Sequence, residues 1–350
     1  MKKVTIAIDA MGGDYGAAVT VPAAIAVLKK HKNLRLILVG DEDFLEAQVK
    51  SHTKRSLRRL TIKHASEQVA MDELPSKALR KKKDSSMRVA INLVRDGIAR
   101  ACVSSGNTGA LMATSRFVLK TLPGVDRPAL ISSLPTRIPH KGVYMLDLGA
   151  NIDSCADHLY QFAIMGSVMT RALHGIKKPK VGLLNIGEEE IKGNDLVKRT
   201  AQMLSESKEI NFYGYIEGND IFKGVVDVVV CDGFIGNITL KSLEGLLKMV
   251  GSYAKKAFLG SFYGKFATII AIPMLKKLKT NLDPNKRNGA SLIGLKGVVI
   301  KSHGSANVEA FKCAIEEAML EAENDVPRLI GDKVGKILVE ESSIEQPIVR

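Results

Sequence analysis

Tryptophan is absent from the 350 residues, and aromatic side chains make up only 5% of the chain. This scarcity argues against a surface that stacks nucleic-acid bases on aromatic rings. No apolar run approaches the length of about 20 residues that a membrane-spanning helix needs. The first apolar run follows Lys2 and Lys3 and already ends at Asp9. We therefore expect it to be the first strand of a cytoplasmic protein and not a signal peptide.

Cysteine is also scarce, because only Cys102, Cys155, Cys231 and Cys313 occur, and no pair has the C-x-x-C spacing of zinc or redox sites. The fingerprints G-x-G-x-x-G, G-x-x-x-x-G-K-[ST] and G-x-S-x-G are missing as well, and we expect no cofactor. Cys231 could be proposed as a nucleophile because it ends an expected strand. Its apolar neighbours favour a buried thiol, and reduced, mostly buried thiols are the general expectation.

Positive charge is abundant and is concentrated in two segments of the chain, whose net charge is +14. Residues 51–100 carry 13 Lys and Arg against 5 Asp and Glu, and residues 241–290 carry 10 against 2. Two basic zones on a nearly neutral body favour an acidic partner: an acidic protein, anionic lipid or nucleic acid. Solvated helix faces are the alternative.

Short β-branched runs alternate with longer helical patterns, and several of these runs are apolar at consecutive positions. Strands buried on both faces have this character, so the sequence predicts an α/β fold with a doubly wound, largely parallel sheet. We expect a single domain over residues 1–350 with one excursion from it, and two lobes are the alternative. The expected strands are 4–9, 34–40, 101–105, 129–134, 143–149, 180–186, 210–216, 226–232 and 297–303.

Glycine, asparagine and small hydroxyl residues follow six of these strands, at the strand ends where open sheets bind ligands. Glycine lets the backbone approach a ligand closely, while asparagine, serine and threonine supply donors and helix caps. Ordinary turns would explain each loop alone, but six such loops predict one convergent polar pocket. The loops are 9–14, 106–109, 149–151, 187–194, 232–237 and 302–305.

The segment VSSGNTGALMA, residues 103–113, has the form of a strand that passes through a glycine-containing turn into a helix. Free N–H groups at a helix N-terminus favour an anion. We expect residues 104–109 to hold phosphate through the backbone, assisted by the side chains of Ser105, Asn107 and Thr108. The pyrophosphate of a nucleotide is the alternative.

Together the loops closely resemble the PlsX family of acyl-ACP:phosphate acyltransferases, in order from residue 3 to residue 330. The resemblance implies transfer of a long-chain fatty acyl group from acyl carrier protein to inorganic phosphate, giving acyl phosphate for phospholipid synthesis. It also implies a homodimer with a fold like those of isocitrate and isopropylmalate dehydrogenases and phosphotransacetylases. The matching blocks are IDAMGGD (8–14), SSGNTGALMA (104–113), DLGAN (147–151), VGLLNIGEEEIKGN (181–194), DVVVCDGFIGN (227–237) and NGASLIGLKGVVIKSHG (288–304).

Phosphate is already a nucleophile and a thioester is an activated donor, so such a site needs hydrogen-bond donors and no enzymic nucleophile. Within the resemblance, Lys192 positions phosphate or stabilises the oxyanion, and Asn237 donates to the oxyanion. A surface lysine and a helix cap are the alternatives. His303 either protonates the leaving thiolate or orders its loop. The other expected phosphate- or substrate-binding residues are Asp9, Gly12, Gly13, Ser105, Gly106, Asn107, Thr108, Gly109, Asn151, Asp232 and Gly236.

Four aspartates near these loops, Asp9, Asp14, Asp147 and Asp232, could suggest a metal site like that of decarboxylating dehydrogenases. Uncompensated carboxylates would repel phosphate, so we expect each to hold its loop by hydrogen bonds and predict no metal. Ile235 stands where the family often has threonine, which argues against a phosphate contact at that position.

A basic segment, SKALRKKKDSSMRVAINLV (76–94), surrounds an expected helix start capped by Asp84 or Ser85. The family has a similar motif where the acidic carrier protein docks, and attraction between opposite charges would speed that encounter. An ordinary exposed basic helix and direct phosphate contact are the alternatives. The expected docking residues are Arg80, Lys81, Lys82, Lys83 and Arg88.

Residues 246–279 combine helical periodicity with an apolar stretch that Pro273 interrupts and lysines flank. The stretch is too short to span a bilayer but suits shallow insertion into an anionic membrane surface. Burial of a helical hairpin, residues 241–285, at a dimer interface is an equal alternative. The expected membrane contacts are Phe266, Ile269, Ile270, Ile272 and Leu275.

These observations predict a dimeric acyltransferase that visits the membrane transiently, where the acyl-phosphate:glycerol-3-phosphate acyltransferase is a candidate partner. A small-acyl phosphotransacetylase using coenzyme A is the nearest alternative, but the apolar hairpin and the basic docking segment favour a lipid-linked carrier. A non-enzymatic basic protein that binds membrane or nucleic acid would leave the six loops without purpose. No nucleic-acid partner is therefore expected.

Overall fold

A computed structural model describes residues 3–50, 58–260, 263, 268, 271–274 and 288–344, and strands and helices alternate along most of the chain. The strands are β1 (Val4–Asp9), β2 (Leu34–Gly40), β3 (Leu60–His64), β4 (Ala101–Ser104), β5 (Ala129–Pro135), β6 (Gly142–Leu146), β7 (Lys180–Leu184), β8 (Asn211–Ile216), β9 (Val228–Val230), β10 (Ala290–Ile293) and β11 (Val298–Lys301). The helices are α1 (Ala17–Lys30), α2 (Glu42–Lys50), α4 (Pro75–Lys81), α5 (Ser86–Arg95), α6 (Thr108–Leu119), α7 (Ala156–His174), α8 (Asp195–Glu206), α9 (Gly233–Leu259), α11 (Val308–Glu323) and α12 (Val326–Ile344).

The eleven strands of the described residues form one sheet in the order β3-β2-β1-β4-β11-β10-β5-β6-β9-β7-β8. Most neighbouring strands are parallel, as predicted. Three antiparallel pairs, β11–β10, β10–β5 and β5–β6, separate the two parallel halves. Because three reversals is an odd number, β1, β4 and β11 run opposite to β6, β9 and β7. The six loops therefore fall into two groups of three, a division that the sequence did not predict.

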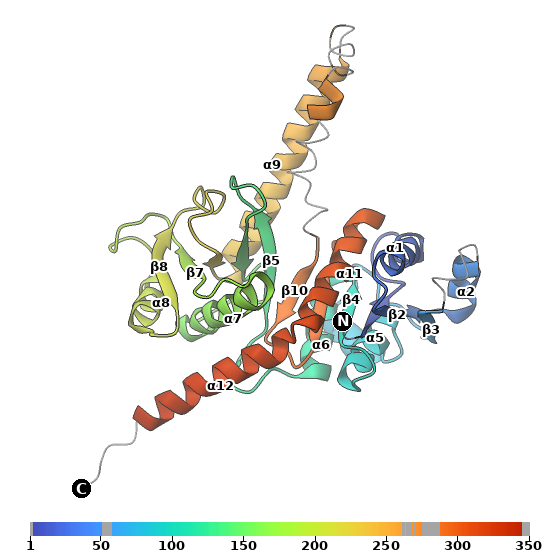
Figure 1. Ribbon diagram of the computed structural model, residues 1–350, viewed down its shortest axis with the longest axis horizontal. Helices are drawn as coiled ribbons and strands as arrows, with labels where there is room; N and C mark the ends of the chain where they lie inside the picture. Colours follow the sequence, from blue (N-terminus) through green and yellow to red (C-terminus); the bar gives the residue numbers. More distant parts are fainter. Residues whose placement is uncertain are drawn as a thin grey trace.

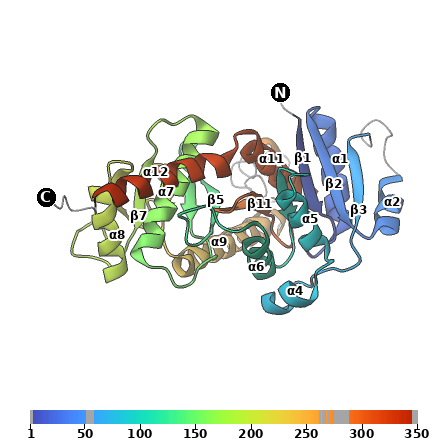
Figure 2. The same ribbon diagram turned by 90° about the horizontal axis from the view of Figure 1, so that it is seen from below.

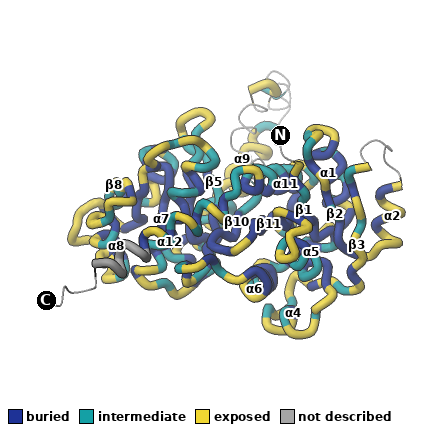
Figure 3. Tube along the Cα trace, turned by 60° about the horizontal axis from the view of Figure 1, so that its bottom comes forward, coloured by how far each residue is buried: buried dark blue, intermediate teal, exposed yellow. Residues whose placement is uncertain are grey.

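Helices cover both faces of the sheet, so its strand residues alternate between two apolar layers. In the N-terminal half, Ile6 and Ile8 pack with α1 and α11, whereas Ala7 packs with α5 and α6 on the other face. Phe162 of α7 is fully buried in the C-terminal half, where α7, α8 and α12 share a core with β6, β7 and β9. Figures 1 and 2 show the two halves side by side, and Figure 3 shows the buried residues concentrated along the sheet. This is the arrangement of a doubly wound sheet.

Helix α9 projects away from the body of the molecule, as Figure 1 shows. The hydroxyl of Thr268 donates to the carbonyl of Phe258 at 3.3 Å, so Thr268 lies against the C-terminal end of this helix. Of the expected membrane contacts, Ile272 is 40% exposed. The others, Phe266, Ile269, Ile270 and Leu275, lie outside the described residues. No helix in the described part of the chain is long and apolar enough to cross a bilayer.

Candidate functional site

Asp9, at the end of β1, holds together the first group of loops, which comprises residues 9–14, 104–109 and 302–305 and is called the phosphate-loop group below. Its carboxylate is buried and accepts hydrogen bonds from the hydroxyls of Ser86 and Ser104, both at 2.6 Å. Burial raises the pKa of Asp9, and these hydrogen bonds oppose the rise. The prediction that this aspartate holds its loop by hydrogen bonds is confirmed.

Gly12 and Gly13 let the first two loops of this group touch. A Cβ atom at Gly12 would lie 2.5 Å from a carboxylate oxygen of Asp9 and 2.9 Å from the nitrogen of Gly106. Gly13 has a φ of +85°, and a Cβ there would lie 2.6 Å from the Ser105 hydroxyl oxygen. That hydroxyl donates to the carbonyl of Gly12 at 2.8 Å. Both glycines are therefore needed for close approach, and Ser105 braces the loops.

The loop at residues 104–109 presents the N-terminus of α6. Asn107 caps this helix by accepting from the N–H of Ala110 at 2.9 Å, and its side-chain amide donates to the carbonyl of Met71 at 2.7 Å. The expected phosphate-binding side chain of Asn107 is thus engaged within the protein. Thr108, the first residue of the helix, is exposed. The backbone N–H groups of the first turn and the Thr108 hydroxyl remain the features of this loop that suit an anion.

Lys301 lies in the matching block 288–304 but was not among the expected site residues. It ends β11 beside the phosphate-loop group and is only 8% exposed. Its Nζ donates to the carbonyl of Ser105 at 3.4 Å and to that of Ser302. Burial lowers the pKa of Lys301 to about 8, although Asp14 and Asp9 attract its charge. In the sequence, the feature that could have identified Lys301 is a lysine at the end of the apolar run VVIK. The structure thus places a cation beside the loop expected to hold phosphate.

His303 lies exposed in the third loop of the same group. The backbone N–H of His303 donates to the side-chain oxygen of Asn288 at 3.0 Å, and the ring Nδ1 lies 2.9 Å from the hydroxyl oxygen of Ser305. Asn288 also donates to the hydroxyl of Ser302 at 2.7 Å. These contacts support the loop-ordering role. Among the described residues, no hydrogen bond engages Nε2 of His303.

The second group of loops comprises residues 147–151, 185–194 and 232–237 and is built around Asp147. This buried carboxylate accepts from the N–H groups of Leu130 and Ala150, both at 2.9 Å, and from the N–H of Asn151 at 2.7 Å. Burial raises the pKa of Asp147, and the hydrogen bonds oppose the rise. The carbonyl of Asn151 accepts from the N–H of Gly233 at 3.0 Å, which joins two of the loops. Asp147 therefore has the predicted loop-holding role.

Asp232 begins α9 as its N-cap, accepting from the N–H groups of Phe234 at 2.9 Å and Ile235 at 3.0 Å. Gly236 lies in the first turn, where a Cβ would come within 1.8 Å of the carbonyl oxygen of Asp147. Asp232 therefore shapes this site as a helix cap, and Gly236 shapes it by allowing the close approach of Asp147.

Asn237 is half-buried against Gly149, where a Cβ would lie 3.2 Å from the Asn237 side-chain amide carbon. Because Asp232 caps α9, the helix-cap alternative for Asn237 is wrong. Lys192 is exposed, and its carbonyl accepts from the amide of Asn185 at 3.4 Å. Its loop follows β7, which pairs directly with β9, so Lys192 and Asn237 follow neighbouring strands.

Hydrogen bonds join loops within each group, and among the described residues none links the phosphate-loop group to the second group. Of the expected site residues, the first group contains Asp9, Gly12, Gly13, Ser105, Gly106, Asn107, Thr108, Gly109 and His303, and the second contains Asn151, Lys192, Asp232, Gly236 and Asn237. In the described ranges, no three His, Cys, Asp or Glu side chains are arranged to hold a metal ion.

The basic docking segment adjoins the phosphate-loop group, because a Cβ at Gly109 would lie 2.8 Å from the ring of Pro75. Of the two expected caps, Ser85 begins α5 by accepting from the N–H of Arg88 at 3.4 Å. Asp84 instead accepts from the hydroxyl of Ser66 at 2.6 Å. The segment is therefore held against α6 and its loop.

The basic side chains of this segment differ in their surroundings. Lys82 forms an ion pair with Glu67 at 3.7 Å, and the Arg88 guanidinium lies 5.1 Å from the ring centre of Phe117. Of the expected docking residues, Arg80, Lys81 and Lys83 are exposed.

The cysteines are only partly as predicted: Cys102 and Cys231 are buried, Cys313 is half-buried and Cys155 is exposed. Cys155 is exposed because it precedes α7, where it and His158 form a capping box. Burial raises the pKa of Cys231 well above that of a free thiol, which favours an inert thiol over a nucleophile.

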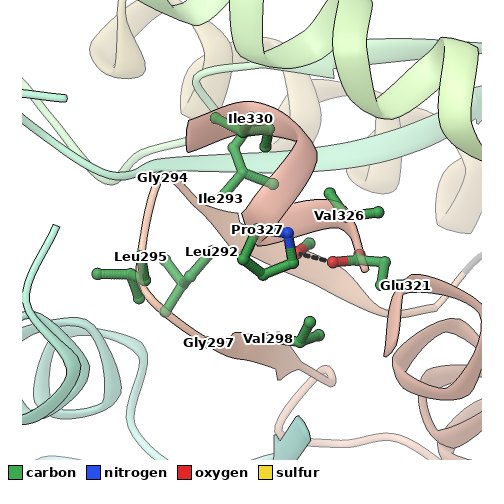
Figure 4. Close-up of a pocket in the computed structure, with 11 residues that line it drawn as sticks. Leu292, Ile293, Gly294, Leu295, Gly297, Val298, Glu321, Val326, Pro327 and Ile330 are labelled. Carbon is green, nitrogen blue, oxygen red and sulfur yellow. Dashed lines mark hydrogen bonds between the residues drawn. The ribbon is translucent and has the colours of Figure 1, made fainter. Parts of the chain in front are cut away.

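Two cavities lie elsewhere in the molecule. The larger, about 200 Å³, is lined by residues that include Tyr144, His174, Asn288 and Glu317. The smaller, about 10 Å³, lies beside Glu321, which accepts from the hydroxyl of Ser291 at 2.9 Å (Figure 4). The smaller cavity is at the lower limit for a single water molecule. Asn288 lines the larger cavity and accepts from the backbone N–H of His303, which connects this cavity to a candidate site loop.

Comparisons with known proteins bear on the whole chain. A family model described as "Fatty acid synthesis protein" matches residues 4–329. Phosphate acyltransferase from Coxiella burnetii (strain Dugway 5J108-111) is 56% identical over 337 residues, which cover 96% of this chain and 98% of that protein. Phosphate acyltransferase from Nitrosococcus oceani is 58% identical over 327 residues, covering 93% and 95%.

Solved structures with the same fold are far less similar in sequence. A phosphotransacetylase from Streptococcus pyogenes has a TM-score of 0.60 at 19% identity, and EutD phosphotransacetylase from Staphylococcus aureus has 0.59 at 17%. Each covers 91% of this chain, which in turn covers 94% of each. At this level of identity the likeness concerns the fold alone. The narrower resemblance to isocitrate dehydrogenases stays a prediction.

Proposed function

Because the chain belongs to the fatty acid synthesis protein family, in which PlsX falls, we propose that it is a phosphate acyltransferase that transfers a long-chain fatty acyl group from acyl carrier protein to inorganic phosphate. The observation that carries this proposal is 56% identity to a phosphate acyltransferase over almost the entire chain. The two groups of polar loops supply donors suited to an anion and to a developing oxyanion.

We assign phosphate to the phosphate-loop group. The N–H groups at the start of α6 and the hydroxyl of Thr108 would bind phosphate oxygens, and Lys301 lies close enough behind the loop to favour their charge. Asp9 has a positioning role, because Ser86 and Ser104 occupy its carboxylate.

We assign the thioester to the second group, where Lys192 and Asn237 would stabilise the oxyanion. A phosphate oxygen attacks the carbonyl carbon, forming the new C–O bond, and the carbonyl electrons move onto oxygen. When the carbonyl re-forms, the C–S bond breaks and sulfur leaves as thiolate. The thiolate takes the proton that hydrogen phosphate loses, directly or through Nε2 of His303. This assignment requires both groups to reach the same acyl donor.

The decisive experiment supplies the purified protein with palmitoyl-acyl carrier protein and radiolabelled phosphate. A labelled, hydroxylamine-sensitive acyl phosphate is the expected product. Because phosphate attacks the donor directly, no acylated cysteine or serine should accumulate on the enzyme. Capture of such an intermediate, or absence of acyl phosphate, would contradict the proposal.

A small-acyl phosphotransacetylase using coenzyme A is the second candidate, favoured by the shared fold of the phosphotransacetylase from Streptococcus pyogenes. Comparing acetyl-coenzyme A with palmitoyl-acyl carrier protein as donors separates the two. The carrier-linked donor is expected to have the higher kcat/KM.

We further propose a homodimer that contacts an anionic membrane transiently and docks the carrier protein on the basic segment. The exposed side chains of Leu246, Met249 and Tyr253 on α9 support an intersubunit or membrane contact, as does Ile272 beyond it. Exposed Arg80, Lys81 and Lys83 beside the phosphate-loop group support docking of an acidic carrier. The membrane acyl-phosphate:glycerol-3-phosphate acyltransferase is the proposed recipient of the product. We also propose that residues 1–350 form a single domain with a helical hairpin over residues 241–285.

A further inference from the structure

Five apolar side chains in or next to the second group of loops are each at least 50% exposed. Single exposed apolar residues are ordinary, but a cluster of them rimmed by polar residues marks a binding surface. These residues, called the apolar patch below, are Ile152, Ile186, Ile191, Phe234 and Ile238.

The sheet brings the members of the patch together. β9 lies between β6 and β7, so the loops that follow these three strands are neighbours. The hydrogen bond from the N–H of Gly233 to the carbonyl of Asn151 places Ile152 next to the start of α9. Pairing of Leu183 with Val230 carries Ile186 to the same edge of the sheet.

Two local features complete the patch. The side-chain amide of Asn185 donates to the carbonyl of Gly187 at 3.0 Å and to that of Lys192 at 3.4 Å, so their loop folds back and returns Ile191 to this edge. Phe234 and Ile238 are four residues apart on α9 and therefore share one face of the helix.

We propose that the apolar patch binds the alkyl chain of the fatty acyl donor. The proposal rests on the proposed function, since it takes Lys192 and Asn237 as the groups that face the thioester carbonyl. Asn237 lies between Phe234 and Ile238 in the first two turns of α9, so the patch is continuous with that point. The alkyl chain attached to the thioester carbonyl would therefore contact the patch.

Charge favours an alkyl chain over other occupants of this surface. Glu188, Glu189 and Glu190 are exposed in the same loop as Ile186 and Ile191. Three carboxylates repel an acidic carrier protein and an anionic membrane but do not affect an uncharged chain. Carrier and chain would thus use different surfaces, the carrier on the basic docking segment and the chain here.

The test compares donors of different chain length. Ile186→Ser and Phe234→Ser are assayed with palmitoyl- and butyryl-acyl carrier protein, beside Ile98→Ser as a control. Ile98 is also an exposed apolar residue but precedes β4. Loss of one apolar contact should lower the palmitoyl-to-butyryl ratio of kcat/KM about tenfold in each patch variant. The ratio of the control should equal that of the wild type.

A binding readout keeps the result independent of turnover. Fluorescence titration with cis-parinarate should show about tenfold weaker binding in the patch variants than in wild type and Ile98→Ser. The proposal would be overturned if the patch variants lost kcat/KM equally on both donors or bound parinarate as the wild type does. A changed molar mass of these variants by light scattering would also overturn it, because the patch would then join two copies of the chain. If the wild type makes no acyl phosphate at all, the proposed function is wrong. Parinarate binding alone then tests whether the apolar patch binds an alkyl chain.

Discussion

Lys301 is the residue whose position most changes the expected chemistry. Its buried charge lies beside the phosphate-loop group, and its pKa of about 8 means that the charge is lost as pH rises above that value. Lys301→Met should raise the KM for phosphate at least tenfold at pH 7. In the wild type, the KM for phosphate should increase at pH values above 8. The Lys301→Met variant should show no such increase. Initial rates at varied phosphate and pH provide the measurement.

Lys296→Met is the matched control, since Lys296 is exposed and lies before β11. Its KM for phosphate should match that of the wild type throughout. A pH-independent KM in the wild type would show that Lys301 has no influence on phosphate.

Lys192 and Asn237 are predicted to act on the oxyanion, so Lys192→Ala and Asn237→Ala should each lower kcat about 100-fold or more. The circular dichroism spectrum should not change, because the Lys192 side chain is exposed and that of Asn237 half-buried. Lys198→Ala, an exposed lysine on α8, serves as the control. Near-normal kcat in both variants would remove these residues from the site.

Single residues were predictable where a motif also dictates local structure. Asp147 and Asp232 stand at strand ends, and most of their hydrogen bonds stay within or near their own loops. Asp9 was predictable as a strand end, but its partners Ser86 and Ser104 lie on distant segments of the chain. The position of Lys301 beside the phosphate-loop group was not predictable, because its partner Ser105 lies in a loop about 200 residues earlier in the chain. Burial of a charge depends on such distant neighbours and not on local pattern.

Helix α11 carries two acids one turn apart, Glu317, which is half-buried, and Glu321, which is buried. Burial raises the pKa of Glu317 to about 7 and that of Glu321 well above its ordinary value. The folded state therefore holds protons that the unfolded state releases. These acids contribute most stability below about pH 4.5, and that contribution is lost as pH rises through 7 and beyond.

Glu321→Gln keeps a hydrogen-bonding group near Ser291 but cannot ionise. Its free energy of unfolding relative to wild type should rise by roughly 1–3 kcal/mol between pH 5.5 and pH 8. Urea titrations at the two pH values measure this difference. Glu309→Gln, on an exposed part of the same helix, should show no such change. An equal pH dependence in wild type and Glu321→Gln would disprove the assignment.

Most strands were predictable because short β-branched runs separated by helical patterns leave few alternatives. β3 and β10 were not predicted; β3 is partly exposed and β10 pairs antiparallel with both neighbours. The expected strand 143–149 ends at Leu146, because Asp147 turns the backbone to gather N–H groups from its loop. Boundaries moved where a side chain competed with the sheet for hydrogen bonds.

At the scale of the whole molecule, docking of an acidic carrier should depend on the exposed lysines of the basic segment. Lys81→Glu combined with Lys83→Glu should raise the KM for palmitoyl-acyl carrier protein about tenfold at low salt. The difference from wild type should shrink near 0.5 M salt, because screening weakens both. Lys29→Glu combined with Lys30→Glu gives the same charge change at the end of α1. Equal effects of the two pairs would point to net charge alone.

Membrane contact is tested at Ile272, which is exposed beyond α9. Ile272→Asp should abolish flotation with vesicles containing anionic lipid, since a carboxylate opposes both insertion and surface charge. Activity on the soluble donor should persist. Ile138→Asp, an exposed isoleucine between β5 and β6, is the control. Unchanged flotation of Ile272→Asp would exclude contact through this residue.

The relative direction of the two sheet halves could not be predicted from the sequence. It depends on three antiparallel pairings, and β10 and β11 are contributed by residues 290–301, far from the strands they join. Local patterns give the existence of strands, whereas their order is decided by which buried faces fit together across long separations.

β11 lies beside β4, and Lys301, Ser302 and Gly304 contact loops made from the first third of the chain. During synthesis, the edge of β4 that pairs with β11 therefore stays unpaired until residues near 305 have emerged from the ribosome. Nascent chains shorter than this lack the third loop of the phosphate-loop group and remain unable to assemble it.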